Sequence, residues 1–206
     1  MLETLRCCLR TNAPVRLDEN FRLDLNWWRE NLAGWNGVTF LEFKDFNNMV
    51  ALDASTDGSI LGGPGLGGFN FINNEWFKCT VPDSFLGWII ADYELLAHII
   101  SIRLWGHEWA GLRVWGLTDS EPCELLLRNW RSRHNKRLQM ARTIASLQHQ
   151  LGFEWVSGPV RSSDNVLPDC ASRWGNPERR DTFWKTCEAL NICPTERFVE
   201  PQMFHF

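Results

Sequence analysis

Paired cysteines and a secretory signal are both missing from this sequence of 206 residues. Its 7 cysteines are scattered and include no Cys-x-x-Cys pair, so we expect neither a disulfide framework nor a zinc site. Residues 1–6 lack the basic region, apolar core and cleavage site of a signal peptide. We therefore predict reduced thiols in an intracellular protein, either cytoplasmic or nuclear.

A membrane-spanning run is missing as well. The most apolar window, residues 85–105, is interrupted by Asp92, Glu94, His98 and Arg103. These polar side chains make the window unsuited to cross a bilayer, so we expect no membrane association. With 44% hydrophobic and 22% charged residues, the chain is long enough for one buried core with appendages.

An overall excess of positive charge is also lacking, because 21 Lys and Arg stand against 25 Asp and Glu for a net charge of -4. This balance argues against a protein that coats nucleic acid non-specifically. Residues 125–153 nevertheless carry no Asp or Glu and six cations, which are Arg128, Arg131, Arg133, Lys136, Arg137 and Arg142. We interpret them as a basic edge that contacts nucleic-acid phosphates, and a solvated helix face is the alternative.

Tyrosine is nearly absent, with 1 Tyr against 12 Trp. Trp rings can stack on nucleic-acid bases. Core and interface packing is the more common role of Trp, and we expect most of these rings there.

Hydrophobic periodicity predicts a helical arm followed by a layered α/β domain. Leu25, Trp28 and Leu32 have helical spacing, so a helix is expected within an N-terminal connector over residues 1–44. The glycine-rich residues 62–68 are assigned to a hairpin turn. Three antiparallel strands joined by hairpins are expected at residues 46–53, 69–72 and 76–80.

Helices and strands then alternate along the chain. Helices are expected at residues 92–105, 120–130, 135–150 and 164–174, and strands at 112–119 and 153–156. We place the α/β domain at residues 45–175 and a C-terminal tail at 176–206, with one amphipathic helix at 178–190.

Two acidic residues, Asp53 and Asp119, each end an apolar strand. Burial of a carboxylate at such a position is costly unless a cation or hydrogen bonds compensate its charge. Glu94 in the first turn of one helix and Asp169 in the first half of another can point at the same spot. Four converging acids repel one another, and divalent cations such as Mg²⁺ or Mn²⁺ would relieve that repulsion. Taken singly, Glu94 or Asp169 is more often a solvated surface carboxylate.

Two other kinds of site fit the same stretch less well. Asp53, Ser55 and Asp57 resemble the start of a calcium-binding loop, but the twelfth position of that loop is Pro64 where a bidentate Glu is needed. The glycines of 62–68 lack the Lys and following Ser or Thr of a phosphate-binding loop, and a strand rather than a helix follows them. A shared metal site of the four acids is therefore the preferred interpretation.

Four blocks of the sequence resemble, in order and in spacing, the signature blocks of the ribonuclease H domain of retroelement reverse transcriptases. The blocks are Leu-Asp-Ala-Ser-Thr-Asp-Gly at 52–58 with Gly67 and Gly68, Tyr-Glu-Leu-Leu-Ala at 93–97, Leu-Thr-Asp-Ser at 117–120, and Asp-Asn-Val-Leu-Pro-Asp-Cys-Ala-Ser-Arg at 164–173. Upstream, Asp-Leu-x-Trp-Trp and Trp-Asn-Gly within 24–37 resemble the retrotransposon type, including DIRS-like elements. The resemblance covers about residues 15–175.

The resemblance implies a ribonuclease H-like α/β fold, with a mixed five-stranded sheet of three antiparallel and then two parallel strands flanked by helices. It implies that Asp53, Glu94, Asp119 and Asp169 are the catalytic acids and bind two Mg²⁺ ions, with Mn²⁺ as a possible substitute, and that Asp53 bridges both ions. The implied activity is hydrolysis of the RNA strand of an RNA/DNA hybrid, next to a polymerase domain N-terminal to this chain. The alternative is a non-catalytic ribonuclease H-like tether or nucleic-acid-binding module.

The blocks depart from the family pattern at three places. Ser120 follows the third acid where Asn is usual, and Pro168 precedes the fourth where Ala is usual, although neither change removes a ligand. Residues 157–163 lack the histidine that assists product release in many ribonucleases H. Arg161 is our candidate for a substitute in that loop and for a further contact to nucleic acid.

Overall fold

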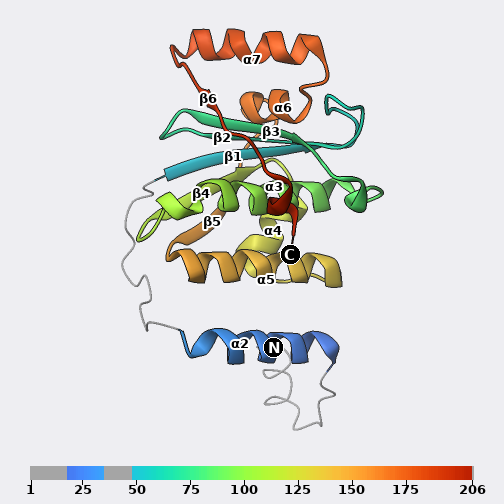
Figure 1. The fold of residues 1–206 in the computed structure, drawn as a ribbon, viewed down its shortest axis with the longest axis vertical. Helices are drawn as coiled ribbons and strands as arrows, with labels where there is room; N and C mark the ends of the chain where they lie inside the picture. Colours follow the sequence, from blue (N-terminus) through green and yellow to red (C-terminus); the bar gives the residue numbers. More distant parts are fainter. Residues whose placement is uncertain (1–17, 35–47, 206) are drawn as a thin grey trace. The chain divides into compact units, whose positions relative to one another are not determined.

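The computed structural model describes residues 18–34 and 48–205 of the chain. Contacts group these residues into two units, one holding the helix α2 (Glu19–Leu32) and the other holding residues 48–205. Figure 1 shows the second unit as a sheet with helices on both of its faces. The rest of the predicted connector, including the Trp-Asn-Gly match at 35–37, lies outside the described residues.

Helix α2 confirms the helix predicted from the spacing of Leu25, Trp28 and Leu32. Asp18 caps its amino terminus by accepting a hydrogen bond of 2.8 Å from the backbone N–H of Phe21. An acid in the first turn and Arg29 in the last turn both suit the helix dipole.

The sheet of the second unit has six strands in the order β5-β4-β1-β2-β3-β6. The strands are β1 (Asn48–Ser55), β2 (Gly65–Asn70), β3 (Glu75–Thr80), β4 (Arg113–Thr118), β5 (Glu154–Pro159) and β6 (Thr195–Glu196). The first three pair antiparallel, while β4 and β5 run parallel to β1. The predicted ribonuclease H-like α/β fold is therefore confirmed, with one strand more than the five expected.

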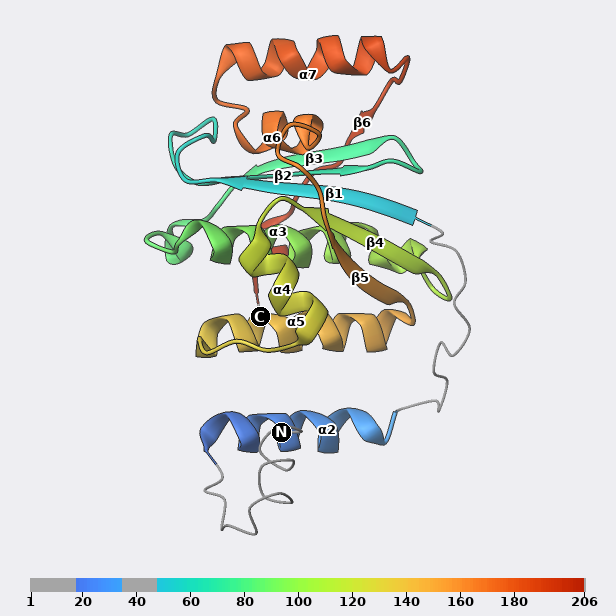
Figure 2. The same ribbon diagram turned by 180° about the vertical axis from the view of Figure 1, so that it is seen from behind.

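The helices form layers on opposite faces of this sheet. The layer of one face contains α3 (Ile90–Trp105), α4 (Glu121–Asn129) and α5 (Asn135–Leu151), and that of the other contains α6 (Val166–Ser172) and α7 (Pro177–Ala189). Both views show α6 and α7 stacked outward from the sheet on the side opposite α3 and α5 (Figures 1 and 2). Each predicted helix of this unit is present, with ends shifted by a few residues.

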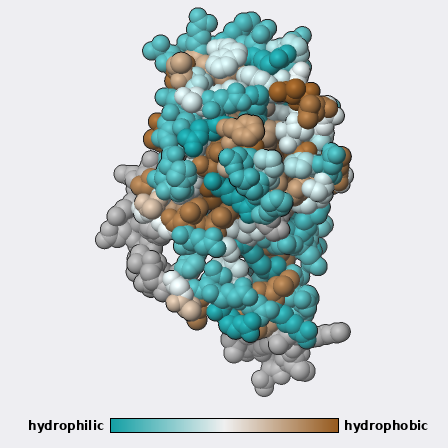
Figure 3. Space-filling view, viewed as in Figure 1, coloured by the Kyte–Doolittle hydropathy of each residue, from teal (hydrophilic) through white to brown (hydrophobic). Residues whose placement is uncertain are grey.

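Two hydrophobic cores fill the layers, one on each face of the sheet. The larger core joins alternate residues of β1, Val50, Leu52 and Ala54, to the buried face of α3. The smaller core joins β2 and β3 to α6 and α7 and contains a cluster of aromatic rings around Trp76 and Phe183. Six of the Trp rings in the described part of the chain pack in or against these cores, which are Trp76, Trp88, Trp105, Trp109, Trp155 and Trp174. On the outer face seen in Figure 3, hydrophilic residues predominate and hydrophobic ones form separate patches.

The prediction that the glycine-rich residues 62–68 form a turn is partly wrong. Gly65, Gly67 and Gly68 belong to β2 and pair in register with β1, and the connection from β1 ends before them. A side chain at Gly65 would place a Cβ 2.1 Å from the carbonyl oxygen of Ser172, and one at Gly67 would lie 2.5 Å from that of Pro168. These glycines therefore let the backbone of α6 lie directly against the sheet.

The C-terminal tail is more structured than the single predicted helix. That helix is present as α7, and beyond it β6 extends the sheet by pairing parallel with β3. Arg197 forms an ion pair of 2.9 Å with Glu75 of β3. The chain then enters the 3-10 turn η3 (Pro201–Phe204), where Phe204 is buried against the larger core.

Two further features bear on the sequence predictions. Among the helices within residues 18–34 and 48–205, none has the length and apolar character needed to cross a membrane. The five cysteines within the described part of the chain are all free thiols.

Candidate active site

Asp53 lies near the carboxyl end of β1 and is almost completely buried, with 3% of its surface exposed. Its Oδ2 accepts a hydrogen bond from Ser172 Oγ and pairs with Arg173 Nη1 at 3.2 Å, both from the region of α6. Burial raises the pKa of Asp53 to about 6, because the two partners from α6 only partly offset the loss of hydration and the nearby charge of Asp119 raises the pKa further.

Glu94 approaches the same point from the second turn of α3, because the helix begins at Ile90, earlier than the sequence predicted, and Glu94 too is 3% exposed. Its Oε1 accepts a hydrogen bond of 3.1 Å from the backbone N–H of Ala54, and its Oε2 accepts one of 3.3 Å from Thr118 Oγ1. Glu94 is thereby fixed to the ends of β1 and β4. Burial raises its pKa well above the usual value, and the neighbouring charges of Asp53 and Asp119 raise it further.

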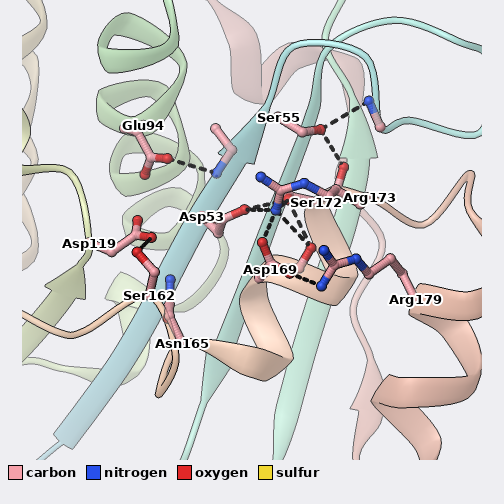
Figure 4. A network of polar contacts seen from close by, with 12 residues as sticks. Asp53, Ser55, Glu94, Asp119, Ser162, Asn165, Asp169, Ser172, Arg173 and Arg179 are labelled. Carbon is pink, nitrogen blue, oxygen red and sulfur yellow. Dashed lines mark hydrogen bonds and ion pairs between the residues drawn. The ribbon is translucent and has the colours of Figure 1, made fainter.

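Asp119 directly follows β4 and is partly exposed. The parallel pairing of β1 with β4 aligns Ala51 with Leu117, so two residues further along each strand bring Asp53 and Asp119 to the same edge of the sheet. Asp119 Oδ2 accepts a hydrogen bond of 2.7 Å from Ser162 Oγ in the loop between β5 and α6 (Figure 4).

The three carboxylates Asp53, Glu94 and Asp119 form one compact group. Each offers an oxygen atom, and these atoms lie within 4.8 Å of one another. Two of the acids are buried, and their raised pKa values show that the charge of the site is not fully compensated. Hard carboxylate oxygens at this spacing fit a divalent cation such as Mg²⁺ or Mn²⁺.

Asp169, the fourth predicted ligand, is not part of that group. It lies on α6, where its Oδ1 pairs with Arg173 Nη1 and its Oδ2 pairs with Arg179 Nη1 at 2.7 Å. Figure 4 shows the Arg173 side chain lying between Asp53 and Asp169. The structure therefore brings three of the four acids together and joins the fourth to Asp53 through an arginine.

The predicted basic edge is partly neutralised by acids that the sequence window 125–153 did not include. Lys136 and Arg137 pair with Asp92 of α3 at 3.3 and 2.7 Å, respectively. Arg128 pairs with Glu124 one turn earlier in α4, at 3.2 Å. These contacts reduce the net charge that this edge offers to a ligand.

The remaining predicted cations lie at different points of the surface. Arg131 and Arg133 are exposed in the connection between α4 and α5, and Arg142 lies further along α5. Arg161 is exposed in the loop that also carries Ser162, the partner of Asp119. A cleft of about 480 Å³ opens between α4 and α5, and its lining includes Arg131 and Arg137.

Several residues of the site were not identified from the sequence. Ser162 and Arg179 touch the predicted acids although nothing in their local sequence singles them out. Ser172 belongs to the fourth signature block, but the block alone gave no indication of its hydrogen bond to Asp53. Arg173 carried a usable signal, because it follows Asp169 by four residues, and that spacing favours an ion pair on a helix. The pairing of Arg173 with Asp53, 120 residues away, had no such signal.

Comparisons with known proteins find likeness in structure and not in sequence. No protein-family model matches the chain, and no curated protein matches it. The ribonuclease H1 of the halophilic archaeon Halobacterium salinarum is 14% identical, with a TM-score of 0.48 over 62% of this chain and 96% of that chain. LC11-RNase H1 in complex with an RNA/DNA hybrid is 11% identical, with a TM-score of 0.46 over 61% of this chain and 93% of that chain. A foamy viral protease-reverse transcriptase in complex with an RNA/DNA hybrid is 16% identical, with a TM-score of 0.47 over 68% of this chain but 22% of that chain.

Proposed function

We propose that this protein is a metal-dependent endonuclease that hydrolyses the RNA strand of RNA/DNA hybrids. The observation that carries the proposal is the group of Asp53, Glu94 and Asp119, whose ligand atoms lie within 4.8 Å of one another. They lie at the edge of a ribonuclease H-like sheet, where β1 and β4 end side by side. The four signature blocks of the sequence supply the expectation of a hybrid substrate.

In this proposal the acids hold two Mg²⁺ ions, which would activate water and stabilise the charge on the attacking and leaving oxygens of the phosphodiester. Asp53 is assigned to both ions because its carboxylate lies within 4.8 Å of ligand atoms of Glu94 and Asp119 and shares the partner Arg173 with Asp169. Glu94 is oriented by Ala54 and Thr118, and Asp119 by Ser162, so that two ligands are fixed before any ion binds. Hydrolysis would leave a 3′-hydroxyl and a 5′-phosphate on the RNA.

The substrate is held, in the same proposal, by contacts to its phosphates. The cations assigned to this role are Arg128, Arg131, Arg133, Lys136, Arg137 and Arg142 of the basic edge, and Arg161, which precedes the Asp119 partner Ser162. Contacts of this kind do not distinguish bases, so we expect binding without sequence preference and with strong dependence on salt.

We further propose that the chain belongs to a retroelement reverse transcriptase with a polymerase domain preceding it, in an intracellular setting. Support comes from the order of the four blocks and from the Asp-Leu-x-Trp-Trp match within α2. The corresponding division is a connector over 1–44, a catalytic domain over 45–175 and a tail over 176–206.

The substrate class is tested by incubating purified protein with end-labelled RNA/DNA hybrid, double-stranded DNA and double-stranded RNA of one sequence. With Mg²⁺ or Mn²⁺ we expect cleavage of the RNA in the hybrid and little cleavage of either uniform duplex. Cleavage of double-stranded DNA would instead indicate a DNA-processing nuclease.

A second candidate function is a ribonuclease H-like module that binds nucleic acid without cleaving it. The engagement of both Asp169 oxygens by Arg173 and Arg179 favours this candidate, because these oxygens are then not free for an ion. Hybrid binding that is unchanged by divalent cations and by Asp53→Asn would support it. Binding that strengthens with the cation and weakens in that variant would support the nuclease.

A further inference from the structure

Arg173 contacts two of the predicted metal ligands with one nitrogen. Its Nη1 lies 3.2 Å from Asp53 Oδ2 and also pairs with Asp169 Oδ1. The same Asp53 oxygen accepts the hydrogen bond from Ser172 Oγ. A guanidinium thus lies between two acids that would otherwise face each other with like charge.

The backbone around Arg173 is held firmly against the sheet. Ser55 Oγ donates a hydrogen bond of 2.8 Å to the carbonyl oxygen of Ser172, and the N–H of Gly175 donates one of 2.9 Å to Gly58. A side chain at Gly58 would place a Cβ 2.7 Å from the Cα of Arg173. The Arg173 side chain is 35% exposed, so its backbone is anchored while its guanidinium has room to turn toward solvent.

A second arginine strengthens the arrangement from the neighbouring helix. Arg179 of α7 pairs with the other oxygen of Asp169 at 2.7 Å. Asp169 therefore has a cationic partner on each oxygen, whereas Glu94 is bonded to the neutral donors Ala54 N–H and Thr118 Oγ1. Positive charge is concentrated on the Asp169 side of the site.

We propose that Arg173 is a positioning residue that competes with a divalent cation for Asp53 and Asp169. The inference rests on the proposed metal-binding function. Asp53, Glu94 and Asp119 would hold a first cation. Asp53 and Asp169 would hold a second cation more weakly, because Arg173 would have to withdraw from the oxygen atoms with which it pairs.

The competition is tested by titrating Mn²⁺ into the protein without nucleic acid and measuring heat by calorimetry. The wild type is expected to show one stronger and one weaker site. Arg173→Gln is expected to bind the second ion about tenfold more tightly, because two ion pairs no longer compete with it. Arg173→Lys, which keeps the charge, should retain the weaker second site. Arg180→Gln removes an equal charge from an exposed position of α7 and should bind like the wild type.

The direction of the change separates competition from a merely structural role. If Arg173 only braced α6, its removal would loosen the site and weaken metal binding. Unchanged or weaker binding by a variant that melts as the wild type does in EDTA would overturn the inference. This test measures metal binding and not cleavage. A protein that does not cleave the hybrid can therefore still show whether Arg173 competes with the second cation.

A measurement on the wild type covers the case in which Arg173→Gln does not fold. The Arg173 Nε–H signal in a nitrogen-15 spectrum is followed while Mg²⁺ is added to the protein. We expect this signal to shift with the second equivalent and to change little with the first. A signal that never shifts, or that shifts fully with the first equivalent, would overturn the inference.

Discussion

Asp53 and Glu94 are two buried acids with raised pKa values. Their ionised forms therefore destabilise the folded protein when no metal is bound. Burial raises the pKa of Asp53 from 3.8 to about 6. Between these values the folded protein binds the proton more strongly than the unfolded chain does. The stability of the metal-free protein should therefore fall as pH rises from about 4 to about 6, and bound cations should restore it above that range.

Asp53→Asn should consequently stabilise the metal-free protein at neutral pH. We expect a gain of about 2 kcal/mol at pH 7 and little gain at pH 4, because the wild-type carboxyl is then protonated. Urea unfolding in EDTA at both pH values measures the difference, with Asp164→Asn as an exposed control. A variant less stable than the wild type at pH 7 would show that the ion pair with Arg173 outweighs the cost of burial.

His98 on α3 is a buried titratable residue outside the site. It is fully buried against Trp155, and neither ring nitrogen has a hydrogen-bond partner among the residues that the structure describes. Burial lowers the pKa of His98 from 6.5 to about 3, so the ring is neutral in the folded protein. The unfolded chain gains the proton as pH falls below about 6.5, and the stability linked to His98 is progressively lost down to about pH 3.

His98→Leu should therefore make the protein less sensitive to acid. We expect its free energy of unfolding to fall less than that of the wild type between pH 7 and pH 4.5. The comparison is made by urea unfolding at both pH values, with the exposed His107→Leu as the control. Equal losses in the wild type and in His98→Leu would mean that His98 does not titrate as its burial requires.

At the level of the single residue, the sequence identified the acids better than it identified their partners. Asp53 and Asp119 could be predicted because each follows a run of apolar residues, a pattern that is local in the sequence, although β1 continues past Asp53 to Ser55. The pairing of Asp53 with Arg173 could not, because it depends on how α6 lies across the sheet. Asp169 was predicted to lie together with the other three acids. In the structure Arg173 lies between Asp169 and Asp53 instead.

At the level of the element, the glycines of β2 set the position of α6. Gly65 and Gly67 are the points where the helix backbone lies closest to the strand. The same helix carries Asp169 and Ser172 and ends at Arg173, so these glycines help to position one side of the candidate site. Glycine is also the commonest residue of hairpin turns, which is why the sequence alone suggested a turn here.

Gly67→Ala should destabilise the protein by about 1–3 kcal/mol, because its Cβ would lie 2.5 Å from the backbone of Pro168 and of Ser172. Gly63→Ala is a matched control in the same segment, where the nearest atom to a new Cβ is 4.0 Å away. Chemical unfolding of both variants measures the difference. Equal effects of the two substitutions would contradict the assigned role of the glycines in β2.

At the level of the whole domain, the tail covers the start of the sheet edge formed by β3. The two residues of β6 pair with β3, and Arg103 of α3 donates a hydrogen bond of 2.5 Å to the carbonyl oxygen of Met203. The long helices and strands could be predicted because their periodicity extends over many residues. A strand of two residues has no period, and its pairing depends on contacts far away in the sequence.

Phe204→Ala tests whether the tail belongs to the folded core. Phe204 is 6% exposed and packs against Phe85, with ring centroids 5.8 Å apart. Its truncation should cost about 3 kcal/mol of stability, as is usual for a buried Phe. Phe198→Ala should have little effect, because that ring is 78% exposed. Equal melting temperatures for the two variants would indicate that η3 does not pack as described.

The central claim, that the group of acids supports cleavage of RNA in a hybrid, is tested most directly by comparing matched variants on a hybrid labelled in either strand. The wild type in Mg²⁺ should cut the RNA strand and leave the DNA strand intact. Asp119→Asn should be slower by roughly a thousandfold or more, since it removes a metal ligand, while Asp164→Asn should cleave at the wild-type rate. Absence of cleavage by the wild type in both Mg²⁺ and Mn²⁺, or equal cleavage by Asp119→Asn, would contradict the claim.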